Sequence, residues 1–73
     1  MDRNNVTQET IADSLSRFHG GATVRVTRGR REIIGDIDVI EAWVTHADGS
    51  VGWEHTVDFG RTWIPREAPI CRH

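Results

Sequence analysis

The chain contains a single cysteine, Cys71, so no disulfide can form within it. With 73 residues it is expected to fold as one domain. A core of that size rarely supplies more than about 3–5 kcal/mol of stability without an additional staple. The sequence has three tryptophans and no tyrosine, and each buried aromatic side chain removes roughly 150–250 Å² from water. We therefore expect most of the three tryptophans, Trp43, Trp53 and Trp63, to be buried in the core.

Basic and acidic residues occupy different parts of the chain, although the net charge is only −2. Residues 17–31 carry five arginines and no acid, whereas residues 32–58 carry seven acids and no basic residue. Lysine is absent, and arginine favours bidentate recognition of carboxylate or phosphate and stacking on aromatic rings. The basic block thus predicts a binding surface. A genome whose base composition suppresses lysine codons would explain the same pattern.

The location of the protein is predicted from its apolar content. No run approaches the roughly 20 apolar residues of a membrane span, and no apolar signal core follows the N-terminal residues. A lone cysteine suits a reducing compartment. We expect a cytoplasmic protein with no membrane contact.

One amphipathic helix is predicted between residues 7 and 19. Thr7 is a suitable N-cap, and Val6 before it can pack against Ile11, the fourth helical residue, as a hydrophobic staple. Apolar residues at i, i+4 and i+7 predict one buried stripe, formed by Ile11, Leu15 and Phe18. Gly20 and Gly21 then end the helix.

The remainder alternates between apolar and polar residues as β-strands do. Strands are expected over residues 22–27, 33–39, 40–44 and 51–57, with a short last strand ending at Pro65. Gly29 predicts a turn, and Gly35 a bend within a strand. The apolar phase changes after Val39, which predicts a bulge or break at residues 39–41.

These elements predict an α+β or mainly β protein, with an N-terminal helix followed by a small, strongly bent antiparallel sheet or barrel. The expected domain covers residues 6–66. A disordered N-terminus, residues 1–5, would precede it, and a flexible tail, residues 67–73, would follow.

The faces of the tryptophans follow from the register of the hairpin around residues 48–49. A two- or four-residue loop pairs Val44 with Trp53, which puts Trp53 in the core and Trp43 on the opposite face. A three-residue loop would instead pair Trp43 with Trp53 and is rejected because it leaves Ile40 and Val44 exposed. In the short last strand, the apolar residue after Trp63 is expected to face inward, leaving Trp63 half covered on the outside.

Two stretches resemble Sm-like barrels, in particular the bacterial proteins of the Hfq kind. They are "VRVTRGRREIIGDI", from Val24, and "WEHTVDFGRTWIPR", from Trp53. The resemblance implies a helix followed by five short strands, and SH3-like barrels share this layout. It also implies single-stranded RNA binding, with His55 at the family's histidine position, Arg17 as a further contact and Glu54 in place of a basic residue. Sm-like barrels also include inhibitors that bind the termination factor Rho.

Residues for catalysis or metal binding are sparse. No Ser–His–Asp set, phosphate-binding glycine loop or lysine nucleophile can be assembled, so an enzyme is not expected. His46, His55, Cys71 and His73 lack the paired short spacings of structural zinc sites. We expect no metal and no cofactor.

The favoured function is a small protein-binding regulator, because interfaces concentrate binding energy in tryptophan and arginine. The predicted partner-binding residues are Arg25, Arg28, Arg30, Arg31, Trp43 and Trp63. By analogy with small phage and mobile-element proteins, the expected partner is a host protein of the transcription or RNA machinery, such as RNA polymerase or a termination factor. Alternatives are Sm-like binding of single-stranded RNA and inhibition of a host defence system. A monomer or dimer is expected.

Overall fold

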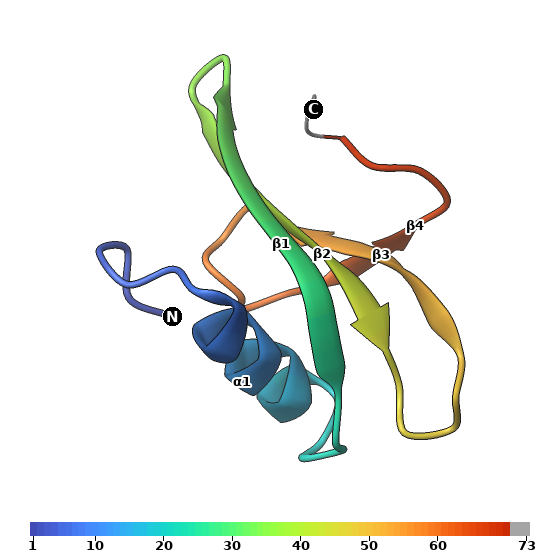
Figure 1. The fold of residues 1–73 in the computed structure, drawn as a ribbon. Coiled ribbons are helices and arrows are strands. Elements are labelled where there is room, and N and C mark those ends of the chain that lie inside the picture. The colour runs from blue at the N-terminus through green and yellow to red at the C-terminus, as the bar shows by residue number, and fades with distance from the viewer. Residues whose placement is uncertain (71–73) are drawn as a thin grey trace.

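The computed structural model describes residues 1–70 and contains one helix and four strands (Figure 1). Helix α1 spans Gln8–Phe18, and strands β1 to β4 span Arg25–Ile34, Ile37–Thr45, Val51–Thr56 and Ile64–Arg66. The strands form one antiparallel sheet in the order β1-β2-β3-β4, and α1 packs against it. The α+β class and the N-terminal helix are confirmed. The sequence predicted either a bent sheet or a barrel. Residues 1–70 form an open four-stranded sheet, without the fifth strand that the resemblance to Sm-like barrels implied.

The predicted domain boundaries after residues 5 and 66 stay predictions, and Cys71 and His73 lie outside the described residues. No helix in residues 1–70 is long and apolar enough to cross a membrane.

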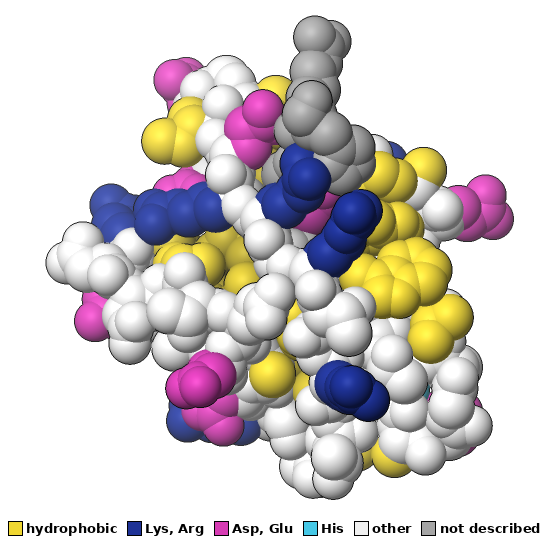
Figure 2. Space-filling view, viewed as in Figure 1, with side chains coloured by type: hydrophobic (Ala, Val, Ile, Leu, Met, Phe, Trp, Pro, Cys, Tyr) yellow, Lys and Arg dark blue, Asp and Glu magenta, His cyan; other side chains and the backbone are white. Residues whose placement is uncertain are grey.

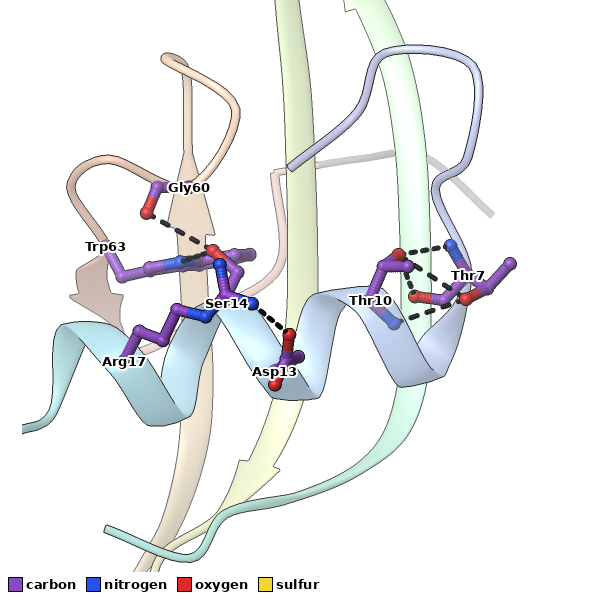
Figure 3. Close-up of polar contacts among 7 residues, drawn as sticks. All are labelled: Thr7, Thr10, Asp13, Ser14, Arg17, Gly60 and Trp63. Atoms are coloured by element: carbon purple, nitrogen blue, oxygen red, sulfur yellow. Dashed lines mark hydrogen bonds and ion pairs between the residues drawn. The ribbon is translucent and has the colours of Figure 1, made fainter. Parts of the chain in front are cut away.

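Helix α1 is specified by local signals at both ends. Thr7 is the N-cap, and its side chain accepts from the Thr10 backbone N–H while the Thr10 hydroxyl accepts from the Thr7 N–H (Figure 3). At the other end, Gly20 and Gly21 have φ values of 73° and 87°, a region that favours glycine. Phe18 is 42 % exposed, contrary to prediction. It is the last residue of α1, so its side chain lies at the end of the helix–sheet interface.

The "RGRR" stretch lies inside β1 and is not the predicted turn. Gly29 is needed because α1 packs directly on it: a Cβ there would lie 2.8 Å from Ile11 Cδ1. The turn occurs instead at Gly35, whose φ is 63°. Ile34 pairs with Ile37 across this turn. The glycine expected to bend a strand therefore closes a tight hairpin.

Strand β2 continues through residues 39–41 without the predicted bulge or break; the irregularity lies in β1, between Val26 and Arg28. Residues 39–42 are all buried. Ile40 belongs to the core under α1, whereas Glu41, on the opposite face, accepts a 2.7 Å hydrogen bond from the Ile70 N–H. The change of apolar phase thus reflects burial of both faces.

The core joins α1, β2 and the segment before β4. Its buried residues are Ile11, Leu15, Ile40, Ala42, Val44 and Trp63. Trp63 is 2 % exposed and Ile64 46 % exposed, the reverse of the predicted orientation. The indole is buried because Ser14 on α1 gives it a polar partner: Trp63 Nε1 donates to Ser14 Oγ over 3.1 Å (Figure 3).

Candidate functional site

The β2–β3 hairpin pairs Trp43 with Trp53, which is the register that the sequence analysis rejected. That rejection assumed that Ile40 and Val44 would be exposed. Instead they lie on the face covered by α1 and are 1 % and 0 % exposed. Trp53, predicted as core, is half-buried on the opposite face of the sheet.

This register creates one row of side chains across all four strands. Arg28 of β1 is opposite Trp43, Trp43 is opposite Trp53, and Trp53 is opposite Arg66 of β4. Directly opposite residues of antiparallel strands project from the same face of a sheet. The neighbours of Trp43 in β2, Ala42 and Val44, are buried on the helix side. The row Arg28–Trp43–Trp53–Arg66, the tryptophan row, therefore lies on the face away from α1.

The two indoles of the row contact each other edge to face. Their centroids are 5.3 Å apart and the ring planes make an angle of 71°, an arrangement that the ring quadrupoles favour. Both rings are half-buried. Thr27 and Arg28 line a shallow surface pocket together with them. Figure 2 shows basic side chains next to a group of hydrophobic side chains on the side of β2, β3 and β4.

The arginines at the ends of the tryptophan row are exposed. The side chains of Arg28, and of Arg25 further along β1, make no hydrogen bond or ion pair with residues 1–70. Arg66 Nε donates to the Ala68 carbonyl oxygen over 3.2 Å. Glu41, an acid on the same face, is buried. The exposed side chains at the two ends of the row are therefore both positively charged.

The predicted arginine cluster is divided because strand residues alternate between faces. Arg30 is half-buried and lies opposite Glu41 of β2, on the face of the tryptophan row. Arg31 faces the other way and makes two hydrogen bonds to Asp38, of 2.9 and 2.6 Å. This contact holds the pKa of the Asp38 carboxyl below its usual value. Arg31 is thus already engaged within the fold.

Three other predicted site residues add no accessible side chain to the tryptophan row, although one of them, His55, lies on the same face of the sheet. Trp63 is buried in the core, so a partner cannot reach it. Arg17 lies on α1, where it forms a 2.7 Å ion pair with Asp13. His55 is buried in β3, and burial lowers the pKa of its imidazole, with Arg66 lowering it further. The two residues of the RNA-binding alternative therefore belong to different elements and share no surface.

A second cluster, which the sequence analysis missed, lies on the helix side of the sheet. His19 Nε2 is 2.9 Å from Glu54 Oε1, and His46 Nε2 is 2.9 Å from Glu54 Oε2. The two imidazoles meet edge to face, with centroids 5.0 Å apart. These three residues, the His–Glu–His cluster, are the one group within residues 1–70 with metal-ligand spacing. The wrong hairpin register hid it, because it placed Glu54 on the solvent face beside Trp43.

No family model matches the sequence, and no curated protein and no solved structure is significantly similar to it. Its function is therefore inferred from the contacts, burial and charges of its own residues.

Proposed function

We propose that this chain is a small, non-enzymatic protein-binding regulator whose partner docks on the tryptophan row. The observation that carries the proposal is the alignment of Arg28, Trp43, Trp53 and Arg66 across the open face of the sheet. Tryptophan and arginine dominate the hot spots of protein interfaces. A paired indole also offers a large contact area and has little conformational freedom to lose on binding.

The partner segment is acidic and presents an apolar side chain. The indoles supply a half-buried apolar centre, and the exposed arginines at both ends supply donors for carboxylates. Guanidinium–carboxylate pairs form two parallel hydrogen bonds, which fix orientation as well as adding affinity. Because Arg28 has no ion-pair partner in residues 1–70, a partner carboxylate would break no existing contact.

The expected partner remains a host protein of the transcription or RNA machinery, with a host defence protein as the alternative. The size of the domain and its tryptophan–arginine surface are what support this choice. Within residues 1–70, the polar side chains on the face of the tryptophan row are arginines, Glu32, Glu41, Thr45 and the buried His55, and they form no Ser–His–Asp set.

Binding of single-stranded RNA in the Sm manner is the competing proposal, since arginines and stacked aromatics also bind single strands. Two observations favour a protein. The net charge is −2, whereas nucleic-acid-binding domains are usually basic. The indoles also stand edge to face, so they do not form a continuous platform on which successive bases could stack.

A pull-down from host lysate with three forms of the chain tests the proposal. The parent chain and the control Arg61→Glu, an exposed arginine outside the row, should retain the same partner. Arg28→Glu combined with Arg66→Glu should lose it with an unchanged melting temperature. Retention by this double variant would contradict docking on the tryptophan row.

A titration with single-stranded RNA at two salt concentrations separates the competing classes. We expect no submicromolar binding. Tight binding with a steep salt dependence, as counterion release requires, would favour the RNA proposal.

A further inference from the structure

Three potential metal ligands converge from three separate elements on the helix side of the sheet. His19 is the C-cap of α1, His46 directly follows β2, and Glu54 lies within β3. The candidate ligand atoms of the three side chains all lie within 4.8 Å of one another. The sequence separation of 35 residues between His19 and Glu54 means that only the folded chain assembles this set.

The carboxylate at the centre of the cluster is buried and incompletely paired. Glu54 is 4 % exposed. Its Oε2 lies 2.9 Å from His46 Nε2, yet it accepts no hydrogen bond from residues 1–70. The distance is within the range of an ion pair, but the contact does not have the geometry of a hydrogen bond. A buried carboxylate oxygen without a donor is costly, because it has lost its hydration. A cation between the three groups would remove this cost.

We propose that His19, His46 and Glu54 bind one divalent transition-metal ion, and that zinc fits this ligand set. Two imidazole nitrogens and one carboxylate suit ions such as zinc, whereas calcium and magnesium prefer sites made of oxygen alone. Three protein ligands with a water in the fourth position are the usual pattern of open zinc sites.

The geometry requires only small side-chain movements. Four ligands at about 2.0–2.1 Å from zinc are roughly 3.3 Å apart in a tetrahedron, and the two nitrogen–oxygen distances from the histidines to Glu54 are 2.9 Å. The imidazoles have side-chain exposures of 29 % and 27 %, so they can rotate toward a common centre. A groove lined by both histidines, Glu54 and Trp63 gives solvent access to the site.

Bound zinc would cross-link the fold. It would join the end of α1, the β2–β3 hairpin and the middle of β3, in a chain that has no intrachain disulfide. Because the ligands assemble only in the folded chain, the free energy of metal binding adds to the free energy of unfolding. Zinc binding is therefore measurable as thermal stabilisation, independently of any partner.

The test is thermal denaturation and calorimetric titration of the full chain, first stripped of metal with chelator and then given zinc chloride. We expect one zinc per chain, and a midpoint raised by roughly 10–20 °C when zinc is about a hundredfold above its dissociation constant. Magnesium chloride should give no shift.

Glutamine variants locate the site, because an amide can still donate a hydrogen bond to Glu54 but does not replace an imidazole ligand. His19→Gln and His46→Gln should each abolish the zinc-dependent shift while leaving the metal-free midpoint close to that of the parent. Two controls should keep the shift: His55→Gln, on the other face of the sheet, and Cys71→Ser combined with His73→Ala, which removes the thiol and imidazole near the C-terminus.

Cobalt provides a readout that does not depend on stability. Cobalt bound in four-coordinate geometry by the parent chain should give intense visible absorption, and His46→Gln should lose it. No zinc-dependent shift in the parent chain would overturn the proposal. A shift that persists in the His19→Gln, His46→Gln double variant would overturn it equally, because the ion would then bind elsewhere.

Discussion

The indole N–H of Trp63 donates a 3.1 Å hydrogen bond to the hydroxyl of Ser14, which lies 49 residues earlier in the chain. The same hydroxyl donates to the Gly60 carbonyl oxygen over 3.2 Å (Figure 3). Ser14 therefore connects α1 to two points of the loop between β3 and β4. This connection holds Trp63 in the core, whereas the register of the β2–β3 hairpin places Trp43 and Trp53 on the opposite face of the sheet.

The first prediction concerns the relative importance of the tryptophans for stability. Trp63→Ala should lower the free energy of unfolding by about 3–5 kcal/mol, because it empties the largest buried site of the core. Ser14→Ala should cost about 1 kcal/mol or slightly more, since it leaves the indole N–H without its acceptor. Urea denaturation measures both. A larger loss for Trp53→Ala than for Trp63→Ala would contradict the observed burial.

The second prediction tests the pairing of Trp43 with Trp53. A double-mutant cycle with Trp43→Ala and Trp53→Ala should give a coupling energy of about 0.5–1.5 kcal/mol, as expected for an edge-to-face aromatic pair. Trp43→Ala should also weaken partner binding by about 2 kcal/mol or more, as for a hot-spot residue. Denaturation of the four forms measures the coupling. A coupling near zero would mean that the rings do not touch in solution.

The third prediction compares two glycines. Gly60 has a φ of 88°, and a Cβ there would collide with Ser14 Oγ. Gly60→Ala should therefore lower the free energy of unfolding by about 1–3 kcal/mol through overpacking, with backbone strain in addition. Gly52→Ala is the matched control, because a Cβ at Gly52 meets nothing within 4 Å, and its effect should be within about 0.5 kcal/mol. Equal effects of the two substitutions would contradict the close packing of Gly60 on α1.

The fourth prediction concerns pH. Burial lowers the pKa of His55 from its ordinary 6.5, and Arg66 acts in the same direction, against the opposing effects of a backbone hydrogen bond with Ile64 and of Glu41. Above about pH 7 the imidazole is neutral in both states and contributes nothing. As the pH falls below 6.5, the unfolded chain takes up the proton first, so the folded state loses stability. His55→Gln should therefore flatten the stability profile between pH 5 and 7, as measured by chemical denaturation in buffers across that range.

A separate loss of stability is expected at lower pH from Asp58. Its carboxylate accepts hydrogen bonds from the Thr56 hydroxyl and the Thr62 backbone N–H, and the hydroxyl contact is the main reason that the pKa of Asp58 lies below its usual 3.8. The stabilisation is present above pH 4 and is lost as the pH falls through the folded-state pKa. Asp58→Asn should weaken this acid dependence and leave the profile between pH 5 and 7 unchanged. An unaltered acid limb in this variant would contradict the role given to Asp58.

The sequence by itself determined the elements whose signals are local. Thr7 and the glycine pair at 20–21 specify where α1 begins and ends, because capping and positive φ depend on a few neighbouring residues. The alternation of apolar and polar residues predicted that the rest of the chain forms β-strands. The sequence also indicated Arg28 and Trp43, two members of the tryptophan row, as binding residues, because tryptophan and arginine are common in protein interfaces.

Only the tertiary structure decided which face each strand residue occupies. A shift of one residue in register exchanges the two faces of a strand, and the apolar pattern of β2 was ambiguous because both of its faces are buried at residues 39–42. For the same reason, Trp53 and Arg66 of the tryptophan row and the His–Glu–His cluster could not be predicted. Trp63 is inside because Ser14, far away in sequence, supplies the hydrogen-bond partner that a buried indole requires. Contacts across such separations follow from packing, and no local pattern encodes them.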